Sequence, residues 1–489
     1  MTAADHAASG RPTLGHGQTI HATAGVPDTA SSEPREPPLL DRNPRLALAV
    51  FCGLEAAAIG LFLWFGRDQW FFLDEWDFLA DRQLGSPDDL LRPHNEHWST
   101  IPIVAYRAIW SLFGLHAYWP YQLLSILNHL AIAALLRVVM RRAGVAPWIA
   151  TAASALFVLF GSGDENILWA FQLQFASPLT FGLIHLVLAD HDGPIGRRDW
   201  FGLLAGLAAL MGSSVGITMV AVVGLATLVR RGWRAALFHT VPLGAIFSIW
   251  WFAYGQEGVM NHSDLEGTVR FALEGLRQTF RTLGMIPGVG VALAAVLVVG
   301  VGLMIGRLDG RTARRRMAAS IALLVGGVVF LLSAGWGRAW AFGPGYANAS
   351  RFVHVAAALV LPAVALGVDA IYRRWRSIGL VAVALLLIGI PGNVARSARY
   401  GERFEHRLGN PELLLSVGRL PLARELPPDT KPFDRVAREV TLDWLISSIE
   451  ADKLPCPENR PIRPTRAMAV ALGVELERLR EAGSTIDCS

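Results

Sequence analysis

Long apolar segments recur along most of the chain, and they constrain its fold more than any other feature. Each is close to the roughly 20 residues that an α-helix needs to cross a hydrocarbon layer about 30 Å thick. Of the 489 residues, 53% are hydrophobic and 17% are charged. Such a composition does not suit a soluble protein, so it excludes a nucleic-acid-binding protein or a cytosolic enzyme despite the pI of about 9.2.

We predict an all-α integral membrane protein with about eleven transmembrane helices. Arginine clusters occupy alternate connections between the apolar segments, which marks those connections as cytoplasmic by the positive-inside rule. The resulting topology places the N-terminus in the cytoplasm and the C-terminus outside the membrane. The predicted spans are 46–65, 117–136, 146–162, 175–189, 200–212, 216–229, 237–254, 286–305, 317–334, 352–371 and 377–394.

The segment 200–229 is too long for a single span, because an unbroken helix would be about 45 Å long. It would also place the pairs Arg197/Arg198 and Arg230/Arg231 on opposite faces of the membrane. A break at 212–216, which reads Gly-Ser-Ser-Val-Gly, removes both conflicts. Two short spans and a hairpin that reaches part-way through the bilayer remain alternatives here.

Three parts of the chain differ in composition. Residues 1–44 lack apolar periodicity and predict a disordered cytosolic leader, and residues 45–394 form the transmembrane domain. The external C-terminal region, 395–489, shows amphipathic helical patterns near 433–451 and 465–482. Such patterns predict a small helical region outside the membrane.

The first external loop, 66–116, contains amphipathic stretches near 75–91 and 99–113. Helices of this length with one apolar face tend to lie along the membrane interface. We therefore expect two interfacial helices in this loop.

Three cysteines are too few for a disulfide scaffold or a structural zinc site. Cys52 lies in the first span, whereas Cys456 and Cys488 lie in the C-terminal region. If that region is exported, Cys456 and Cys488 are candidates for a disulfide bond.

Three carboxylates, Asp74, Glu75 and Asp77, follow the first span among aromatic residues. Partial burial beside a bilayer raises the pKa of a carboxyl group toward the range that suits a general base. Trp76, between these acids, is a candidate to stack on a substrate. The alternative is an ordinary helix start, with Asp74 as N-cap and the other acids in the first turn.

A second acidic pair, Asp164 and Glu165, follows the third span on the same predicted side. Both acidic clusters could face one cavity, where they would share a metal ion or divide the tasks of base and substrate contact. Asp74 and Asp164 are the candidate metal ligands, although no metal site is compelling. A solvated turn before a capped helix is the alternative interpretation.

The run His94-Asn95-Glu96-His97 contains side chains that can bind a metal. Its order is not that of a metalloprotease, and no third or fourth ligand is identifiable. Substrate or phosphate contacts by His94, Glu96 or His97 are the favoured interpretation, with structural hydrogen bonds as the alternative.

The Asp-Glu motif after the first span, the first loop with two interfacial helices and the eleven or so spans before an external tail resemble the GT-C superfamily of membrane glycosyltransferases. That superfamily includes protein O-mannosyltransferases, aminoarabinose transferases of lipid A and mycobacterial arabinofuranosyltransferases. The resemblance covers about 46–394. The Trp-Trp-Asp-Tyr-Gly motif of oligosaccharyltransferases is absent, and the tail has no recognisable domain pattern, so the sugar and the acceptor remain open.

The resemblance implies a multi-pass protein of a bacterial plasma (inner) membrane with an extracytoplasmic active site. It also implies a polyprenyl-phosphate-linked sugar donor and a glycan, lipid or protein acceptor. It maps the catalytic carboxylate onto Asp74, with Glu75 adjacent, and a second acidic residue onto Asp164 or Glu165. The base would take the proton of the acceptor hydroxyl while prenyl phosphate leaves. No cofactor is required, although a divalent cation, Mg²⁺ or Mn²⁺, remains an alternative.

The developing phosphate charge needs cationic or hydrogen-bonding groups. Arg338 and Arg351 are candidates in a loop that the topology places outside, together with Tyr346. Arginine suits phosphate because its fork binds two oxygens at once. Contact with an anionic lipid is the alternative role.

Two other classes of function remain open. A transporter or flippase of a lipid or glycan would use broken helices, and the break at 212–216 is its one support. A non-catalytic envelope-assembly protein could keep the same scaffold, because a fold does not specify a function.

Overall fold

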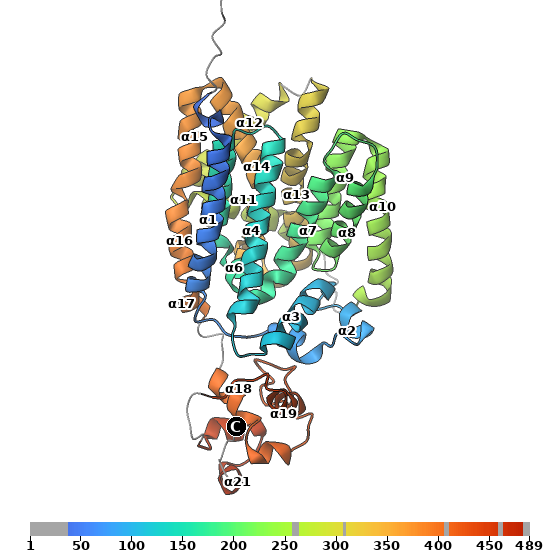
Figure 1. Cartoon of the computed structure of the whole chain (residues 1–489), viewed down its shortest axis with the longest axis vertical. Helices are drawn as coiled ribbons and strands as arrows, with labels where there is room; N and C mark the ends of the chain where they lie inside the picture. Colours follow the sequence, from blue (N-terminus) through green and yellow to red (C-terminus); the bar gives the residue numbers. More distant parts are fainter. Residues whose placement is uncertain (1–37, 257–263, 307–309, 405–409, 458–462, 483–489) are drawn as a thin grey trace, which may run out of the picture. The chain divides into compact units, whose positions relative to one another are not determined.

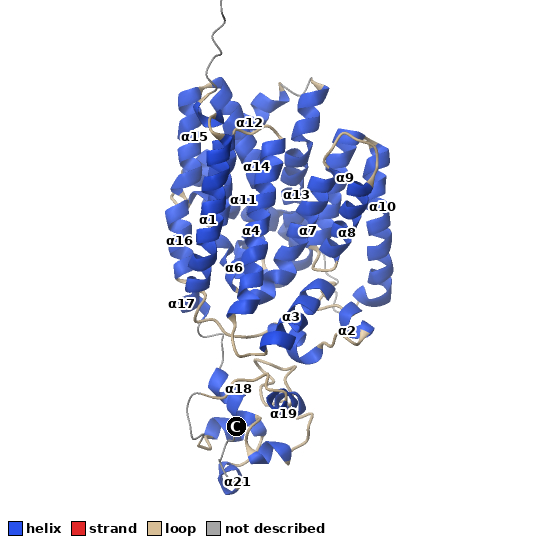
Figure 2. Ribbon diagram, viewed as in Figure 1, coloured by secondary structure: helices blue, strands red, loops and turns tan. Residues whose placement is uncertain are grey.

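The computed structural model describes residues 38–256, 264–306, 310–404, 410–457 and 463–482. Within these ranges every regular element is a helix (Figures 1 and 2). The predicted all-α fold class is therefore confirmed. Most of the predicted leader, 1–44, lies outside the described residues.

Each of the eleven predicted spans coincides with a helix. Seven helical segments in the described part of the chain are long and apolar enough to cross a membrane, or eight if one bent pair counts as a span. The helices are α1 (Pro44–Phe65), α4 (Trp119–Arg142), α5 (Pro147–Val158), α7 (Leu173–Ala189), α8 (Arg197–Leu210), α9 (Val215–Arg231), α10 (Trp233–Trp250), α12 (Val289–Ile305), α13 (Arg311–Phe342), α14 (Ser350–Arg374) and α15 (Arg376–Ile388).

Helix α14 lies inside the bundle, and its apolar stretch is completely buried. A helix that is apolar on every side needs protein or lipid all around it, and here protein surrounds it. A Cβ atom at Gly300 of α12 would overlap the backbone of Gly367 in α14. Small residues at this crossing therefore allow the two helices to approach closely, as is typical of membrane bundles.

The predicted break in 200–229 is confirmed between α8 and α9. Arg231 on α9 is ion-paired with Asp199 on α8, so the two arginine clusters lie at the same end of the bundle. At the other end, the backbone N–H of Ile101 in the first loop donates to the carbonyl of Met211 at 3.0 Å. The break therefore lies at the end of the bundle that carries the first loop.

The connection between the predicted spans 237–254 and 286–305 contains a 20-residue helix, α11 (Leu265–Gly284). It meets α12 at an angle of 109°. Its exposed face carries charged residues such as Arg270 and Glu266, so its average hydropathy is too low to be recognised as a span. Another short helix, α6 (Asp164–Leu168), lies in the connection after α5.

The first loop agrees with the prediction only in its second half. Helix α3 (Thr100–Phe113) matches the stretch near 99–113. The stretch near 75–91 is not one helix, because a π-helical turn (Asp77–Asp81) is separated from α2 (Pro87–Leu91) by a non-helical link that is extended at both ends and contains a turn. Pro87 explains this, since proline begins a helix but disfavours a helical residue before it.

The C-terminal region begins after α16 (Ile390–Ala398), which continues past the predicted boundary. It contains α17 (Tyr400–Phe404), α18 (Pro411–Val417), α19 (Leu442–Glu450), α20 (Arg466–Leu472) and α21 (Leu476–Glu481). The pattern near 433–451 is helical only from Leu442, whereas the pattern near 465–482 forms two helices. The ring of Trp444 stacks on Trp110 at 5.4 Å, which joins this region to the first loop.

Cys456 is disulfide-bonded and Cys52 is free. Cys488 lies outside the described residues. The Cys456–Cys488 pairing therefore stays a prediction.

Candidate active site

A cavity of about 730 Å³ lies at the end of the bundle that carries the first loop. Its walls come from α7, α9, α10, α13 and α14, and the first loop adds Glu96, His97 and Trp98. The volume is within the range that binds small-molecule and cofactor ligands.

Apolar and polar groups are unevenly distributed around this cavity. Aromatic and aliphatic side chains form most of the wall, among them Phe175, Phe247, Trp251 and Phe330. The ionisable side chains that line it are Glu96, His97 and Arg338. A long apolar chain and a charged headgroup can therefore be bound in one continuous space.

A tight turn presents Glu96 and His97 to the cavity. The backbones of His94 and His97 exchange two hydrogen bonds of 3.0 Å each. Asn95, within the turn, has a φ of 52°, in the left-handed region that asparagine tolerates better than most residues. The following Trp98 stacks face to face on Trp250 at 5.2 Å, which fixes the loop against α10.

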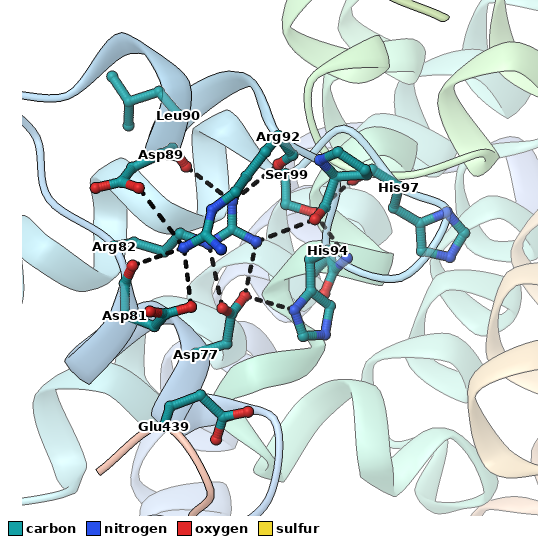
Figure 3. Close-up of polar contacts among 12 residues, drawn as sticks. Asp77, Asp81, Arg82, Asp89, Leu90, Arg92, His94, His97, Ser99 and Glu439 are labelled. Atoms are coloured by element: carbon teal, nitrogen blue, oxygen red, sulfur yellow. Dashed lines mark hydrogen bonds and ion pairs between the residues drawn. The ribbon is translucent and has the colours of Figure 1, made fainter. Parts of the chain in front are cut away.

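Arg82 holds the start of this turn (Figure 3). Its guanidinium donates two hydrogen bonds of 3.1 Å to the carboxylate of Asp77 and others to the carbonyls of Asp89, Arg92 and Pro93. The Arg82 side chain is only 2% exposed. One buried cation therefore satisfies five hydrogen bonds and fixes the path of the loop.

Asp77 also contacts His94, with 2.6 Å between Oδ2 and Nδ1. Burial opposes ionisation of Asp77, but the contact with His94 and the charge of Arg82 outweigh it and lower the pKa of this carboxyl. Asp77 is thus an ionised residue that holds the loop, and it is not among the residues that line the cavity. The Nε2 atom of His94 is buried and has no hydrogen-bond partner among the described residues.

Glu96 forms an ion pair with Arg338 of α13. Burial opposes its ionisation, but the charges of His97 and Arg338 lower the pKa of this carboxyl below its ordinary value. Glu96 Oε1 also lies 3.8 Å from His97 Nε2. The charged pair therefore stands at the polar end of the cavity.

Burial lowers the pKa of His97 to about 4, so its imidazole is neutral near pH 7. The side chain is 9% exposed, and its Nδ1 is buried with no hydrogen-bond partner in the described part of the chain. A buried nitrogen without a partner in a cavity wall is available to a ligand.

Glu75 is completely buried and does not line the cavity. Its carboxyl accepts hydrogen bonds from Tyr106 Oη at 2.7 Å, Tyr118 Oη at 3.1 Å and the backbone N–H of Phe72 at 3.0 Å. Burial raises the pKa of Glu75 to about 7, although these hydrogen bonds favour the ionised form. A pKa near 7 suits a general base. However, Glu75 is buried and hydrogen-bonded within the protein, as a structural residue is.

Asp74 is half-buried and is likewise absent from the lining of the cavity. Its charge acts on Arg438 of the C-terminal region. Trp76 is 2% exposed and packs edge-on against Trp444 at 6.2 Å. The structure thus places Trp76 in the contact with the C-terminal region rather than on the cavity wall.

The second acidic pair belongs to a neighbouring network. Asp164 accepts a hydrogen bond from Ser350 Oγ at 2.9 Å, and Glu165 lies 3.4 Å from Arg351. Arg351 also contacts the hydroxyl of Tyr346.

Phe352 lines the cavity and lies beside this network. The guanidinium groups of Arg338 and Arg351 lie 5.8 Å and 5.2 Å from its centre. Two positive charges therefore approach the same wall.

No group of three or more His, Cys, Asp or Glu side chains that could hold a metal ion is found among the described residues. Asp74 and Asp164 are therefore not part of such a group there. A requirement for Mg²⁺ or Mn²⁺ stays an alternative prediction.

Several cavity residues were not anticipated from the sequence. Ser213 and Ser214 line it from the α8–α9 break, and Trp251 and Phe252 line it from a π-helical turn after α10. The Gly-Ser-rich break was visible in the sequence. The π-helical turn was not, because its residues continue the apolar pattern of α10.

No protein-family model and no curated protein matches the sequence. Among solved structures, the chain is similar to the crystal structure of ArnT from Cupriavidus metallidurans bound to undecaprenyl phosphate. The identity is 15%, the TM-score is 0.44, and the match covers 89% of this chain and 88% of that chain. A likeness at this level identifies neither the family nor the activity of the protein.

Proposed function

We propose that the protein is a membrane glycosyltransferase of the GT-C type, which moves a sugar from a polyprenyl-phosphate donor to a hydroxyl of a glycan, lipid or protein acceptor. The observation that supports it best is the cavity, whose apolar wall ends at the ion pair of Glu96 and Arg338. By the positive-inside rule, this end of the bundle would lie outside the cytoplasm, where such donors are used.

Arg338 would bind the donor phosphate. Its side chain is 20% exposed at the cavity, and a guanidinium can bind two phosphate oxygens at once. Arg351, over the same Phe352 ring, adds positive charge nearby. The apolar wall of α9, α10 and α13 would hold the start of the prenyl chain, so that the anomeric carbon lies near Glu96 and His97.

Glu96 would be the general base. Phosphate would compete with its carboxylate for Arg338, and a released carboxylate regains its basicity because it loses the positive neighbour. The acceptor oxygen then bonds to the anomeric carbon, its proton goes to Glu96, and the bond from carbon to phosphate oxygen breaks with its electron pair on prenyl phosphate. Asp74, the base implied by the family resemblance, does not line the cavity, so we assign the role to Glu96.

The test measures sugar transfer from polyprenyl-phosphate donors in membranes that contain the full-length protein. Glu96→Gln should lower the rate by about 10²- to 10⁴-fold, the usual contribution of a general base. Glu266→Gln is the matched control, because Glu266 is an exposed acid paired with an arginine on α11.

Asp74→Asn separates the two candidate bases. Near-normal transfer by Asp74→Asn, with a large loss in Glu96→Gln, is the expected result. The reverse pattern would return the role to Asp74, and normal transfer by both variants would contradict the proposed enzyme.

A further inference from the structure

A second pocket, of about 220 Å³, lies at the end of the bundle opposite to the first loop. It is bounded by the loop after α7, the turn between α9 and α10, and the start of α13. Its ionisable lining consists of Arg230, Arg231, Arg234, Arg315 and a single carboxylate, Asp192. Such an excess of arginine makes the pocket a site for an anion.

Two of these arginines are engaged within the protein. Arg230 contacts Asp190 at 2.7 Å and Asp192 at 3.2 Å. Arg231 pairs with Asp199 and donates to the carbonyl of Gly193 at 3.1 Å. These contacts hold the loop after α7 against α9, so this wall of the pocket is formed by hydrogen bonds and ion pairs.

The other two arginines are not neutralised in this way. Arg234 and Arg315 are exposed, and neither forms an ion pair with a carboxylate in the described ranges. They come from α10 and α13, on two sides of the pocket. The pocket therefore keeps positive charge that its own acids do not balance.

The surface beside the pocket is that of a membrane interface. Trp233 and Trp200 are 62% and 61% exposed, and exposed tryptophans favour the headgroup level of a bilayer. Leu237 and Val241 are also exposed and follow Trp233 at intervals of four residues, so they share one face of α10. An apolar path thus leads from the pocket along the helix.

We propose that this pocket binds the phosphate headgroup of an anionic phospholipid, with Arg234 and Arg315 as its ligands. The acyl chains would lie along the face of α10 that carries Trp233, Leu237 and Val241. This site is separate from the cavity at the first-loop end, and the proposal does not depend on the proposed transferase activity.

The test uses the purified full-length protein in a neutral detergent, with lipid binding measured by native mass spectrometry. The probes are phosphatidylglycerol, phosphatidylcholine and inorganic phosphate. Wild-type protein should retain phosphatidylglycerol in preference to phosphatidylcholine. The double variant Arg234→Ala/Arg315→Ala should bind phosphatidylglycerol about 25-fold more weakly, since each arginine near an anionic headgroup contributes about fivefold.

The matched control is Arg311→Ala/Arg314→Ala. Both residues are exposed arginines on α13 at the same end of the bundle, and neither lines the pocket. Preserved binding in this control supports the site.

Three results would overturn the proposal. An equal loss in the control variant would show a general effect of surface charge. Displacement of the lipid by inorganic phosphate at equal concentration would show a site for a soluble anion. Equal retention of the two lipids by wild-type protein would show no headgroup selectivity.

Discussion

The free energy of unfolding should fall as the pH rises, because the buried carboxyl of Glu75 loses its proton. Replacing Glu75 with glutamine should remove this pH dependence. Burial raises the pKa of Glu75 from 4.5 to about 7 in the folded protein. Between these values the folded protein keeps the proton and the unfolded chain releases it. The contribution of Glu75 to stability is therefore fully present below pH 4.5 and is lost as the pH rises through about 7.

The size of the effect follows from the width of this window. The free energy of unfolding changes by about 1.4 kcal/mol per pH unit, which gives about 3 kcal/mol in all. In Glu75→Gln one oxygen remains to accept from Tyr106 and Tyr118, but the amide nitrogen cannot accept from the N–H of Phe72. That lost hydrogen bond costs about 1–3 kcal/mol at every pH. The variant should thus be less stable than wild type at pH 5, and more stable than wild type by up to about 2 kcal/mol at pH 8.

The assay compares the thermal unfolding midpoints of the two purified proteins in one detergent from pH 5 to pH 8. The difference between them is the informative quantity, because His97 acts in the opposite direction. Its folded pKa is about 4, below the ordinary 6.5, so its contribution is lost as the pH falls through that window. Both proteins contain His97, and its effect cancels in the difference.

Asp68→Asn is the control, since the side chain of Asp68 is 74% exposed. Its unfolding midpoint should follow wild type at every pH. Parallel curves for Glu75→Gln and wild type would refute the reasoning, because they would show that the buried carboxyl does not take up a proton on folding.

Three further predictions concern stability and covalent structure. Asp77→Asn leaves the buried Arg82 without its counter-charge, so it should lower the free energy of unfolding by about 3–5 kcal/mol. Unfolding in denaturant measures this difference, and an unchanged midpoint would show that the pair contributes nothing. Gly300→Ala should lower the thermal midpoint because its Cβ meets the backbone of α14, whereas Gly302→Ala, which meets no atom within 4 Å, should not; equal midpoints would contradict the close crossing of α12 and α14. Cys456 should resist a thiol reagent until a reductant is added, and immediate labelling would contradict its disulfide.

The transmembrane helices were predictable because the length of an apolar run reports directly on the thickness of a bilayer. Helix α11 was not recognised as a helix, because only one of its faces is apolar and its charges lower the average hydropathy. The broken helix near 75–91 was missed for a different reason. Its apolar spacing is helical, but Pro87 and the extended residues before it override that local preference.

The members of the candidate site were predicted individually, but their grouping was not. Glu96 and Arg338 are 242 residues apart, and their contact depends on how α13 packs beside the first loop. No pattern in the sequence favours Glu96 over Asp74 as the base, because both are acids of the same loop. Burial and the shape of the cavity separate them, and neither can be read from the order of residues.

The break between α8 and α9 affects both the membrane topology of the protein and the wall of the cavity. Ser213 and Ser214 line the cavity there. The carbonyl of Met211 accepts a hydrogen bond from the backbone N–H of Ile101 in the first loop. Substitutions that made 197–231 one continuous helix would remove α9 from the cavity wall and reverse the orientation of every later span. Variants with altered substrate preference are therefore best sought in side chains around this kink, with its backbone geometry left intact.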